Sequence, residues 1–392
     1  MQTAIGIDVH KEKCAAFAEA TVKDRELKPH QKEFLERFND SFKRFDSNMA
    51  GMMRLANALE GHDAHILIEN STKSHDVYWM LRDLGLDVVV AHATDLRNIT
   101  MSTDKNDDND AMKLAAYMRR RLWGEESEFA ECRIPEPRIL IDRELCRFDM
   151  MLRDILSALK RQIRSHMLIR GWKLTREYAD IASPGALREL EYSNNPIFQY
   201  DARFANMLLN AIKTVEKTMD ERMRHDRTYN LVRSVPGFGV LSACYVASMM
   251  GDVKDYGNCR DFASFTGLIP KQYTSADKAK RCGISRRGDP ELRRLICQAT
   301  FVHISHTDGV IKKKYDRLKA SGKHHKVALV ACANSMARML YGILSSGTEF
   351  RSDPITLTKA RSVAESGELE DMMESAETSD SNICETEVRP AR

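Results

Sequence analysis

The chain opens with Thr3-Ala4-Ile5-Gly6-Ile7-Asp8-Val9, a short apolar run that carries one carboxylate near its end. A second apolar run, Cys14-Ala15-Ala16-Phe17-Ala18, follows closely enough to form a strand hairpin with the first. A third run, His65-Ile66-Leu67-Ile68-Glu69, again ends in a carboxylate, and helical spacing from Val77 to Leu84 precedes the strand-like Asp87-Val88-Val89-Val90-Ala91. Strands that alternate with helices predict an α/β domain with a partly parallel sheet.

Four acidic residues stand out by their positions in this domain. Asp8 and Glu69 end two predicted strands, and Asp107 and Asp110 stand three apart at the start of a predicted helix that runs to Arg121. A three-residue step places the last two side chains on one helical face. Carboxylates from strand ends and a helix start can converge into a cage of hard oxygen ligands, which suits Mg²⁺ and phosphodiester chemistry. Taken singly, each of these acids is better explained as a helix cap or a solvated side chain, and only the joint pattern favours a metal site.

The rest of the chain is mainly helical by its spacing. Pro135 and Pro137 mark a linker, after which apolar residues recur at steps of three or four from Leu145 to Ile163 and predict a long amphipathic helix. A second helix is expected from Phe204 to Leu231, and the two form either an ordinary packed pair or a coiled coil. Further helices are expected over Leu241 to Met250, Glu291 to Ser305 and Lys326 to Leu344.

Composition excludes several classes of protein. The 392 residues are 43% hydrophobic and 30% charged, which supports two or three globular domains. The nine cysteines form no close CxxC pair, as expected in a reducing compartment. No apolar run approaches the roughly 20 residues that cross a bilayer, and no signal-peptide pattern is present. We therefore expect a cytoplasmic protein with no membrane partner.

The charge of +3 conceals a strong asymmetry. From Ser362 to Val388 there are nine acidic residues and no Lys or Arg, which leaves about +12 for the remainder. From Lys271 to Lys326 there are fifteen Lys or Arg against five Asp or Glu. This segment is the best candidate for phosphate contacts, whereas the acidic tail has the composition of a disordered segment.

Two sets of motifs, in the same order, resemble one known family. Gly6-Ile7-Asp8-Val9-His10-Lys11, Ile68-Glu69 and Lys105-Asn106-Asp107-Asp108-Asn109-Asp110 resemble the Asp-Glu-Asp-Asp signature of the Piv/MooV-type transposases of the IS110 insertion-sequence family. Val235-Pro236-Gly237-Phe238-Gly239, Phe265-Thr266-Gly267-Leu268-Ile269-Pro270 and Gly283-Ile284-Ser285-Arg286-Arg287-Gly288-Asp289-Pro290 resemble that family's C-terminal domain. The resemblance spans roughly residues 3 to 346.

The resemblance implies an α/β plus α architecture in four parts. Residues 1–130 would form a RuvC-like domain with the RNase H fold, in which Asp8, Glu69, Asp107 and Asp110 hold Mg²⁺, with Mn²⁺ as the alternative metal. Residues 131–230 would be a helical, coiled-coil connector, and residues 231–348 a mainly helical transposase domain. Residues 349–392 would be an acidic disordered tail.

The resemblance also implies a serine nucleophile, which falls at Ser275 in Tyr273-Thr274-Ser275. A serine hydroxyl can attack a DNA phosphorus and hold the strand as a phosphodiester for rejoining. The chain departs from the family at two places, because Ala276 stands where glycine usually follows the serine and Asn70-Ser71-Thr72 stands where Ala-Thr-Gly usually follows the glutamate. Cationic side chains around the serine would neutralise phosphates: Lys271, Lys278, Lys280, Arg281, Arg286 and Arg287.

The resemblance further implies partners that the residues alone do not indicate. These are donor and target DNA, a structured non-coding guide RNA encoded by the element, and further copies of the chain in a homodimer or homotetramer. Two other functions fit parts of the pattern: a metal-dependent nuclease, such as a junction resolvase that hydrolyses DNA with water, and an inert nucleic-acid-binding descendant. A nuclease needs no protein nucleophile, so Ser275 separates it from a recombinase.

Overall fold

The computed structural model describes residues 2–22, 26–92, 96, 107–124, 129–275, 278–284 and 288–351 of the 392-residue chain, and for residues 107–108 and 270–283 the description is limited to the backbone within that range. The predicted acidic tail lies beyond it from residue 352. The chain divides into two compact units, Met1–Glu136 and Pro137–Arg392, which are described separately.

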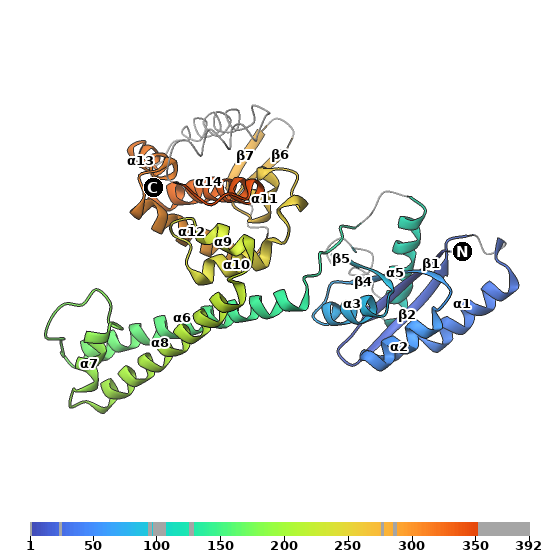
Figure 1. The fold of residues 1–392 in the computed structure, drawn as a ribbon, viewed down its shortest axis with the longest axis horizontal. Coiled ribbons are helices and arrows are strands. Elements are labelled where there is room, and N and C mark those ends of the chain that lie inside the picture. Colours follow the sequence, from blue (N-terminus) through green and yellow to red (C-terminus); the bar gives the residue numbers. More distant parts are fainter. Residues whose placement is uncertain are drawn as a thin grey trace, which may run out of the picture. The chain divides into compact units, whose positions relative to one another are not determined.

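Unit 1 is built on a five-stranded mixed sheet with the order β3-β2-β1-β4-β5 (Figure 1). The strands are β1 (Gln2–Val9), β2 (Lys13–Ala20), β3 (Phe45–Asp46), β4 (Asp63–Glu69) and β5 (Asp87–Ala91). β1 pairs antiparallel with β2 and parallel with β4, and β4 pairs parallel with β5. The predicted α/β class and partly parallel sheet are confirmed.

Helices cover both faces of this sheet because alternate residues of its central strands point to opposite sides. Ile5, Ile7, Ile66 and Ile68 face one core with residues of α1 (Pro29–Ser41), α2 (Met49–Ala58) and α3 (Ser74–Asp83). Ala4 and Leu67 face the other core, where Leu114 and Met118 of α5 (Asp107–Leu122) pack against them. The central strands are therefore buried on both sides, as their continuous apolar runs indicate.

Gly6 lets α5 lie directly on β1. A Cβ atom at this position would stand 2.6 Å from Cβ of Leu114 and closer still to the carbonyl oxygen of Ala111 and the amide nitrogen of Ala115. No side chain fits there, so the helix backbone rests on the strand backbone. This contact fixes where α5 begins relative to the end of β1.

The chain after α5 returns to the sheet. Residues Ala91 and Glu131 form an isolated bridge, and the amide of Cys132 donates to the carbonyl of Val90 over 2.7 Å. Trp79 of α3 donates its indole N–H to the carbonyl of Pro135 over 2.9 Å. These contacts hold the segment up to Glu136 within unit 1.

Unit 2 begins with an arm of two long antiparallel helices, α6 (Pro137–Ile169) and α8 (Pro196–Met223), with α7 (Pro184–Glu191) near the far end (Figure 1). Their interior is apolar, and ion pairs fix the register. Arg222 binds the buried Asp142 at one end over 2.6 Å, and His166 lies 2.9 Å from Asp201 near the other. The predicted helix pair is present.

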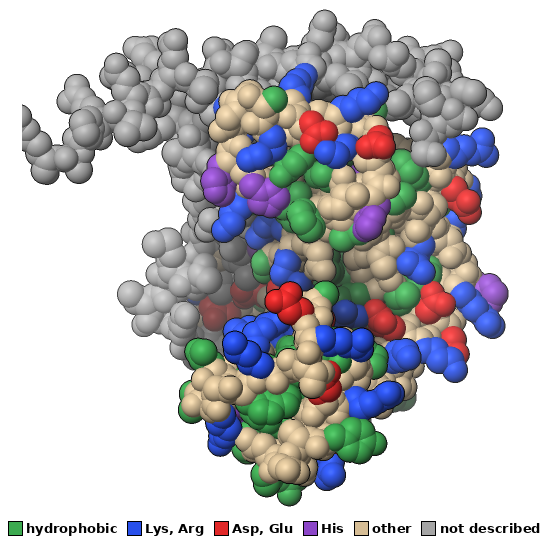
Figure 2. Space-filling view, turned by 90° about the vertical axis from the view of Figure 1, so that its left-hand side faces the viewer, with side chains coloured by type: hydrophobic (Ala, Val, Ile, Leu, Met, Phe, Trp, Pro, Cys, Tyr) green, Lys and Arg blue, Asp and Glu red, His purple; other side chains and the backbone are tan. Residues whose placement is uncertain are grey.

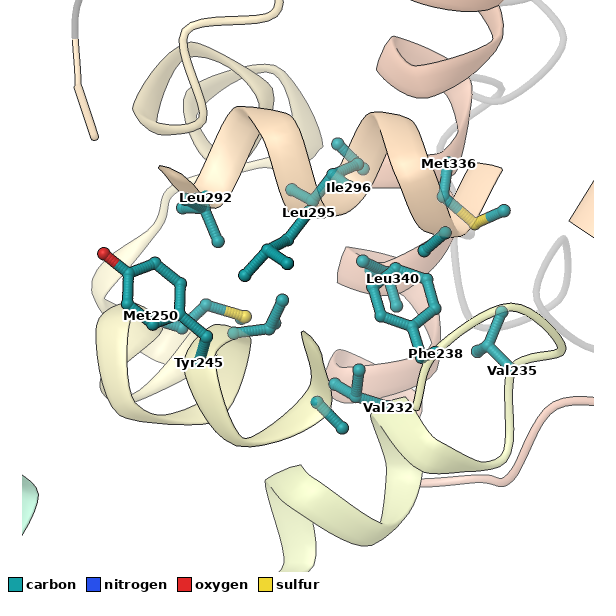
Figure 3. Packing of buried hydrophobic residues seen from close by; sticks show 14 of the residues in the cluster. Val232, Val235, Phe238, Tyr245, Met250, Leu292, Leu295, Ile296, Met336 and Leu340 are labelled. Atoms are coloured by element: carbon teal, nitrogen blue, oxygen red, sulfur yellow. The ribbon is translucent and has the colours of Figure 1, made fainter. Parts of the chain in front are cut away.

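The remainder of unit 2 is a helical core, and one end of α6 and one end of α8 contribute buried residues to it. It contains α9 (Arg227–Arg233), α10 (Val240–Met250), a short 3-10 turn (Val253–Asp255), α11 (Cys259–Phe265), α12 (Pro290–His306), α13 (Val310–Ala320) and α14 (His325–Ser346), together with the antiparallel hairpin of β6 (Pro270–Ser275) and β7 (Lys278–Ile284). Figure 3 shows Tyr245 and Met250 of α10 facing Leu292 and Leu295 of α12, with Leu340 of α14 close by.

By length and apolar composition alone, α14 is the one helix among the described residues that could cross a membrane. Its apolar face is instead used within the protein: Ala333, Met336, Ala337 and Leu340 are completely buried in the core of unit 2. This is the behaviour of a core helix.

The structure corrects one predicted helix. The expected span from Phe204 to Leu231 is two helices, because α8 ends at Met223 and the Asp226 side chain accepts from the amide of Tyr229 to begin α9. Such a side-chain cap satisfies an amide that a new helix leaves without a partner. The helices predicted over Leu241 to Met250, Glu291 to Ser305 and Lys326 to Leu344 are confirmed as α10, α12 and α14.

A Gly6→Ala substitution tests the contact between β1 and α5. The added methyl group would overlap the α5 backbone, so we expect the opening free energy of unit 1 to fall by about 1–3 kcal/mol. Hydrogen exchange followed by mass spectrometry on peptides of β1 and α5 measures this change. Gly309→Ala is the control, because no atom lies within 4 Å of a Cβ at Gly309. Unchanged exchange in Gly6→Ala would contradict the argument.

Candidate functional site

Asp8 and Glu69 lie on the same face of the sheet in unit 1. Asp8 shares its face of β1 with Ala4 and Gly6, and Glu69 shares its face of β4 with Leu67, because side chains two apart on a strand point the same way. The parallel register ends with Ile7 opposite Ile68, so each acid is the next residue after that pair. Both carboxylates are half-buried on the side that α5 covers.

The start of α5 supplies the third described carboxylate to this end of the sheet. Ala111, whose carbonyl oxygen approaches Gly6, directly follows Asp110, and Asp110 is half-buried. Asp107 is the first residue of the helix, one turn earlier, but its side chain lies outside the described residues. The fold therefore brings Asp8, Glu69 and Asp110 to the same region of unit 1, with the backbone of Asp107 beside them.

Nitrogen-bearing side chains contact two of these acids. His10 Nε2 lies 3.1 Å from Asp8 Oδ2, and Lys113 Nζ lies 3.1 Å from Asp110 Oδ1. Close to Asp8, burial raises the pKa of the Cys14 thiol to about 12, and the Asp8 charge adds to this effect. Cys14 is therefore an inert, buried side chain.

The acidic residues match the ligand chemistry of Mg²⁺, which prefers carboxylate oxygens. Among the side chains that the structure describes, however, no three His, Cys, Asp or Glu residues gather closely enough to form a metal-binding group. The strand ends and the helix start fit a magnesium site, whereas a closed cage is not formed by the described side chains. The four-residue metal site stays a prediction.

Ser275, the predicted nucleophile, lies at the end of β6 in unit 2. It pairs with Lys278, the first residue of β7, so Ala276 and Asp277 between them, which lie outside the described residues, connect the two strands. Further along the hairpin, Tyr273 pairs with Lys280, and Gln272 with Arg281. The backbone thus places Ser275 at the tip of a hairpin whose return strand is basic.

Not every predicted cation can be placed to the same extent. Lys271 lies on β6 and Lys278, Lys280 and Arg281 lie on β7, with only their backbone described. Arg286 and Arg287 lie outside the described residues. The phosphate-binding role of these six side chains stays a prediction, and sequence reasoning missed that the segment forms a hairpin.

The base of the hairpin is fixed by contacts of the glycine-containing motifs. Gly288 has φ of 84°, and a Cβ there would overlap the carbonyl oxygen of Phe265 at the end of α11. Asp289 accepts from the amide of Leu292 and so caps α12, and it also accepts from the Tyr245 hydroxyl over 3.0 Å. Burial, and then the Asp289 charge, raise the pKa of Tyr245, which keeps that hydroxyl protonated as a donor.

The turn Pro236-Gly237-Phe238-Gly239 packs on α12. Gly237 has φ of 104°, and a Cβ at this position would lie 3.1 Å from the carbonyl carbon of Ala299 and closer to its oxygen. One turn later, Nδ1 of the buried His303 lies 2.9 Å from the carbonyl oxygen of Pro236. These contacts show that Pro236 and Gly237 pack the turn against α12.

Comparison with known proteins addresses this same region. Residues 229–316 match the family model described as "Transposase IS116/IS110/IS902 family". The C-terminal part of the chain is similar to insertion-sequence transposases. The matched residues include the Gly237 turn, the β6–β7 hairpin and the Asp289 cap, and they begin after unit 1 has ended.

Individual relatives agree with this similarity. The chain is 32% identical over 145 residues to the "Transposase for insertion sequence element IS1328" of Yersinia enterocolitica, covering 36% of this chain and 43% of the relative. It is 31% identical over 142 residues to the "Transposase for insertion sequence element IS1111A" of Coxiella burnetii, covering 36% and 37%. The chain thus spans less than half the length of these two relatives.

A longer alignment extends the similarity to most of the chain. The "Putative transposase y4qE" of Sinorhizobium fredii is 22% identical over 307 residues, which cover 77% of this chain and 74% of the relative. An alignment of 307 residues is longer than unit 2, so it takes in part of both units.

The buried His303 provides a test of the packing of the Gly237 turn. Burial lowers its pKa from the ordinary 6.5, and the hydrogen bond to Pro236 opposes this only in part. As pH falls below 6.5 the unfolded chain therefore binds a proton that the native state does not, and stability falls until the native pKa is reached. We expect urea unfolding to show this loss as the pH falls through the ordinary histidine value of 6.5.

His303→Asn should remove this part of the pH dependence, because the asparagine amide can still donate to Pro236 but does not titrate. His306→Asn is the matched control on the same helix, since His306 is exposed. The same pH dependence of stability in the two variants would show that His303 is not the titrating group.

Proposed function

We propose that the protein is the transposase of an insertion sequence, which cuts and rejoins DNA through a covalent intermediate on Ser275. The family match over residues 229–316, which contains Ser275, carries this proposal. The half-buried acids Asp8, Glu69 and Asp110 on one side of the unit 1 sheet support it, because the resemblance assigns that place to a metal site. The mixed sheet covered by helices on both faces is compatible with the proposed RuvC-like, RNase H fold.

The residues of unit 1 would hold Mg²⁺ through Asp8, Glu69, Asp107 and Asp110. When bound, the metal polarises the phosphodiester and lowers the cost of the charge that develops on its oxygens. His10 and Lys113 would then share Asp8 and Asp110 with the metal, and the positive charge of Lys113 would moderate the repulsion among the acids.

In unit 2, Ser275 would carry out the covalent step. The Ser275 oxygen forms a bond to phosphorus while the bond from phosphorus to the departing strand breaks, and the serine proton passes to the departing oxygen. The number of phosphodiester bonds is unchanged, so the reverse attack by a strand hydroxyl rejoins DNA without an energy source. The cations of the β6–β7 hairpin and of residues 286–287 would hold the phosphates beside the reacting bond.

The proposal includes the partners that the resemblance implies. These are donor and target DNA, a structured guide RNA that the element encodes, and further copies of the chain in a homodimer or homotetramer. A transposase acts on chromosomal DNA, so we place the protein in the cytoplasm in association with the nucleoid.

A covalent-adduct assay tests the chemistry. Purified protein is incubated with Mg²⁺, labelled DNA carrying the ends of the element, and total RNA from cells that contain it. We expect a protease-sensitive protein–DNA adduct with the wild type and with Thr274→Ala, and its loss in Ser275→Ala. Thr274 is the control because it offers the neighbouring hydroxyl on the same strand.

Substitutions of the acids test the metal site in the same assay. Asp8→Asn should lower cleavage by at least about a hundredfold, because it removes a charged ligand of the metal. Asp63→Asn should leave cleavage unchanged, because Asp63 starts β4 at the opposite end of that strand from Glu69. Cleavage that yields no adduct, survives Ser275→Ala and is lost in Asp8→Asn would identify a hydrolytic nuclease instead.

A further inference from the structure

One face of unit 2 combines an exposed aromatic ring, which two half-buried rings support, with positively charged side chains. It is formed by α12, α13 and the start of α14, and we call it the Phe301 surface. Its aromatic residues are the exposed Phe301 and the half-buried Tyr315 and His325. Its exposed cations are Lys319, one turn after Tyr315 on α13, and Lys326, next to His325 on α14. All lie outside the β6–β7 hairpin and residues 286–287.

The three rings come together from three different helices. The ring centroids of Phe301 and His325 are 6.0 Å apart with the planes at 82°, and those of Tyr315 and His325 are 5.9 Å apart, also at 82°. The Tyr315 hydroxyl shares a hydrogen bond of 2.6 Å with Nδ1 of His325. His325 is thus held in place and supports Phe301 from one side, while half of the Phe301 surface stays exposed.

The helices behind the rings are firmly packed. Ala299 is buried on the side of α12 that lies opposite Phe301. Ile311 and Leu318 of α13 are buried on the same helical face as Tyr315, and Ala328 of α14 is buried one turn after His325. Phe301 is therefore presented by a rigid frame, and a flat ligand that contacts it would pay little to order the protein.

The charge around the rings is strongly positive. From Phe301 to Lys326 the chain has seven Lys or Arg and two Asp. Asp316 is occupied by Lys312, whose Nζ lies 2.6 Å from its Oδ1. Figure 2, which looks onto the side of α13, shows Lys, Arg and His side chains next to hydrophobic ones over the upper part of that face.

We propose that the Phe301 surface binds single-stranded nucleic acid, with an unpaired base stacked on Phe301 and the neighbouring phosphates on the surrounding lysines. Exposed aromatic rings within a basic surface are the combination that single strands require, because each nucleotide offers an aromatic base and a charged phosphate. A duplex keeps its bases stacked inside and would use the cations alone. An acidic protein partner would likewise use the cations and leave Phe301 without a role.

Equilibrium binding of short oligonucleotides tests this proposal without strand cleavage. The full-length protein is titrated in EDTA into a labelled single strand of about 12 nucleotides, as DNA and as RNA, and into the corresponding DNA duplex. We expect Phe301→Ala to weaken single-strand binding by about tenfold or more, and Phe301→Trp to restore it. Duplex binding should change little in either variant.

Two further measurements separate this surface from other effects. Phe204→Ala on α8 is the matched control, since Phe204 is 41% exposed, against 50% for Phe301, but lies on the arm. Lys319→Ala and Lys326→Ala should each lower the salt dependence of single-strand binding by about 0.7 in the logarithmic slope. The DNA and RNA strands show whether the 2′-hydroxyl contributes, and tighter binding of either supports the proposal.

Wild-type affinity of Phe301→Ala for both single strands would overturn the proposal, as would an equal loss for single strand and duplex. The outcome is distinct from that of the proposed chemistry. Weaker single-strand binding by Phe301→Ala, together with a covalent DNA adduct on Ser275 in the wild type, would support both proposals. The same weaker binding with no adduct in the wild type would support only the binding proposal.

Discussion

The backbone contact between β1 and α5 at Gly6 fixes the position of α5 on the sheet of unit 1. A side chain at this position would push the helix away from the sheet by the width of a methyl group or more, and Asp110 would move with the helix. Because Asp8 and Glu69 are fixed at the ends of paired strands, the distance between the strand acids and the helix acids depends on this one contact. Gly6, two residues before Asp8, therefore sets how closely the acid of the helix can approach the acids of the strands.

The glycines of unit 2 act by the same principle. Gly237 and Gly288 each bring one backbone segment against the carbonyl of another, at Ala299 and Phe265, and each has a positive φ that other residues rarely adopt. These contacts, with the Tyr245 hydroxyl on Asp289, tie the motif loops to the helices α11 and α12. The hairpin that carries Ser275 is thus attached to a fixed base, although its residues are largely polar.

Much of the fold was predictable because its strands and helices have clear apolar periods. The strand-end positions of Asp8 and Glu69 follow from two short apolar runs, and β1, β4, β5, α10, α12 and α14 are confirmed close to their expected bounds. The break between α8 and α9 was missed because the apolar pattern continues across it and only the Asp226 cap marks it. The Phe301 surface was not predictable, since Phe301, Tyr315 and His325 come together only through the packing of three helices.

The two features of unit 2 proposed to face nucleic acid have a common consequence for specificity. Cations bind phosphates of any sequence, and an aromatic ring stacks on any base. A transposase built on these contacts binds tightly but does not choose a target by them. Choice of target then has to come from groups that read base edges or from base pairing with another strand. A single-stranded segment held on Phe301 would keep its base edges open to such pairing, which is the arrangement that the proposed guide RNA requires.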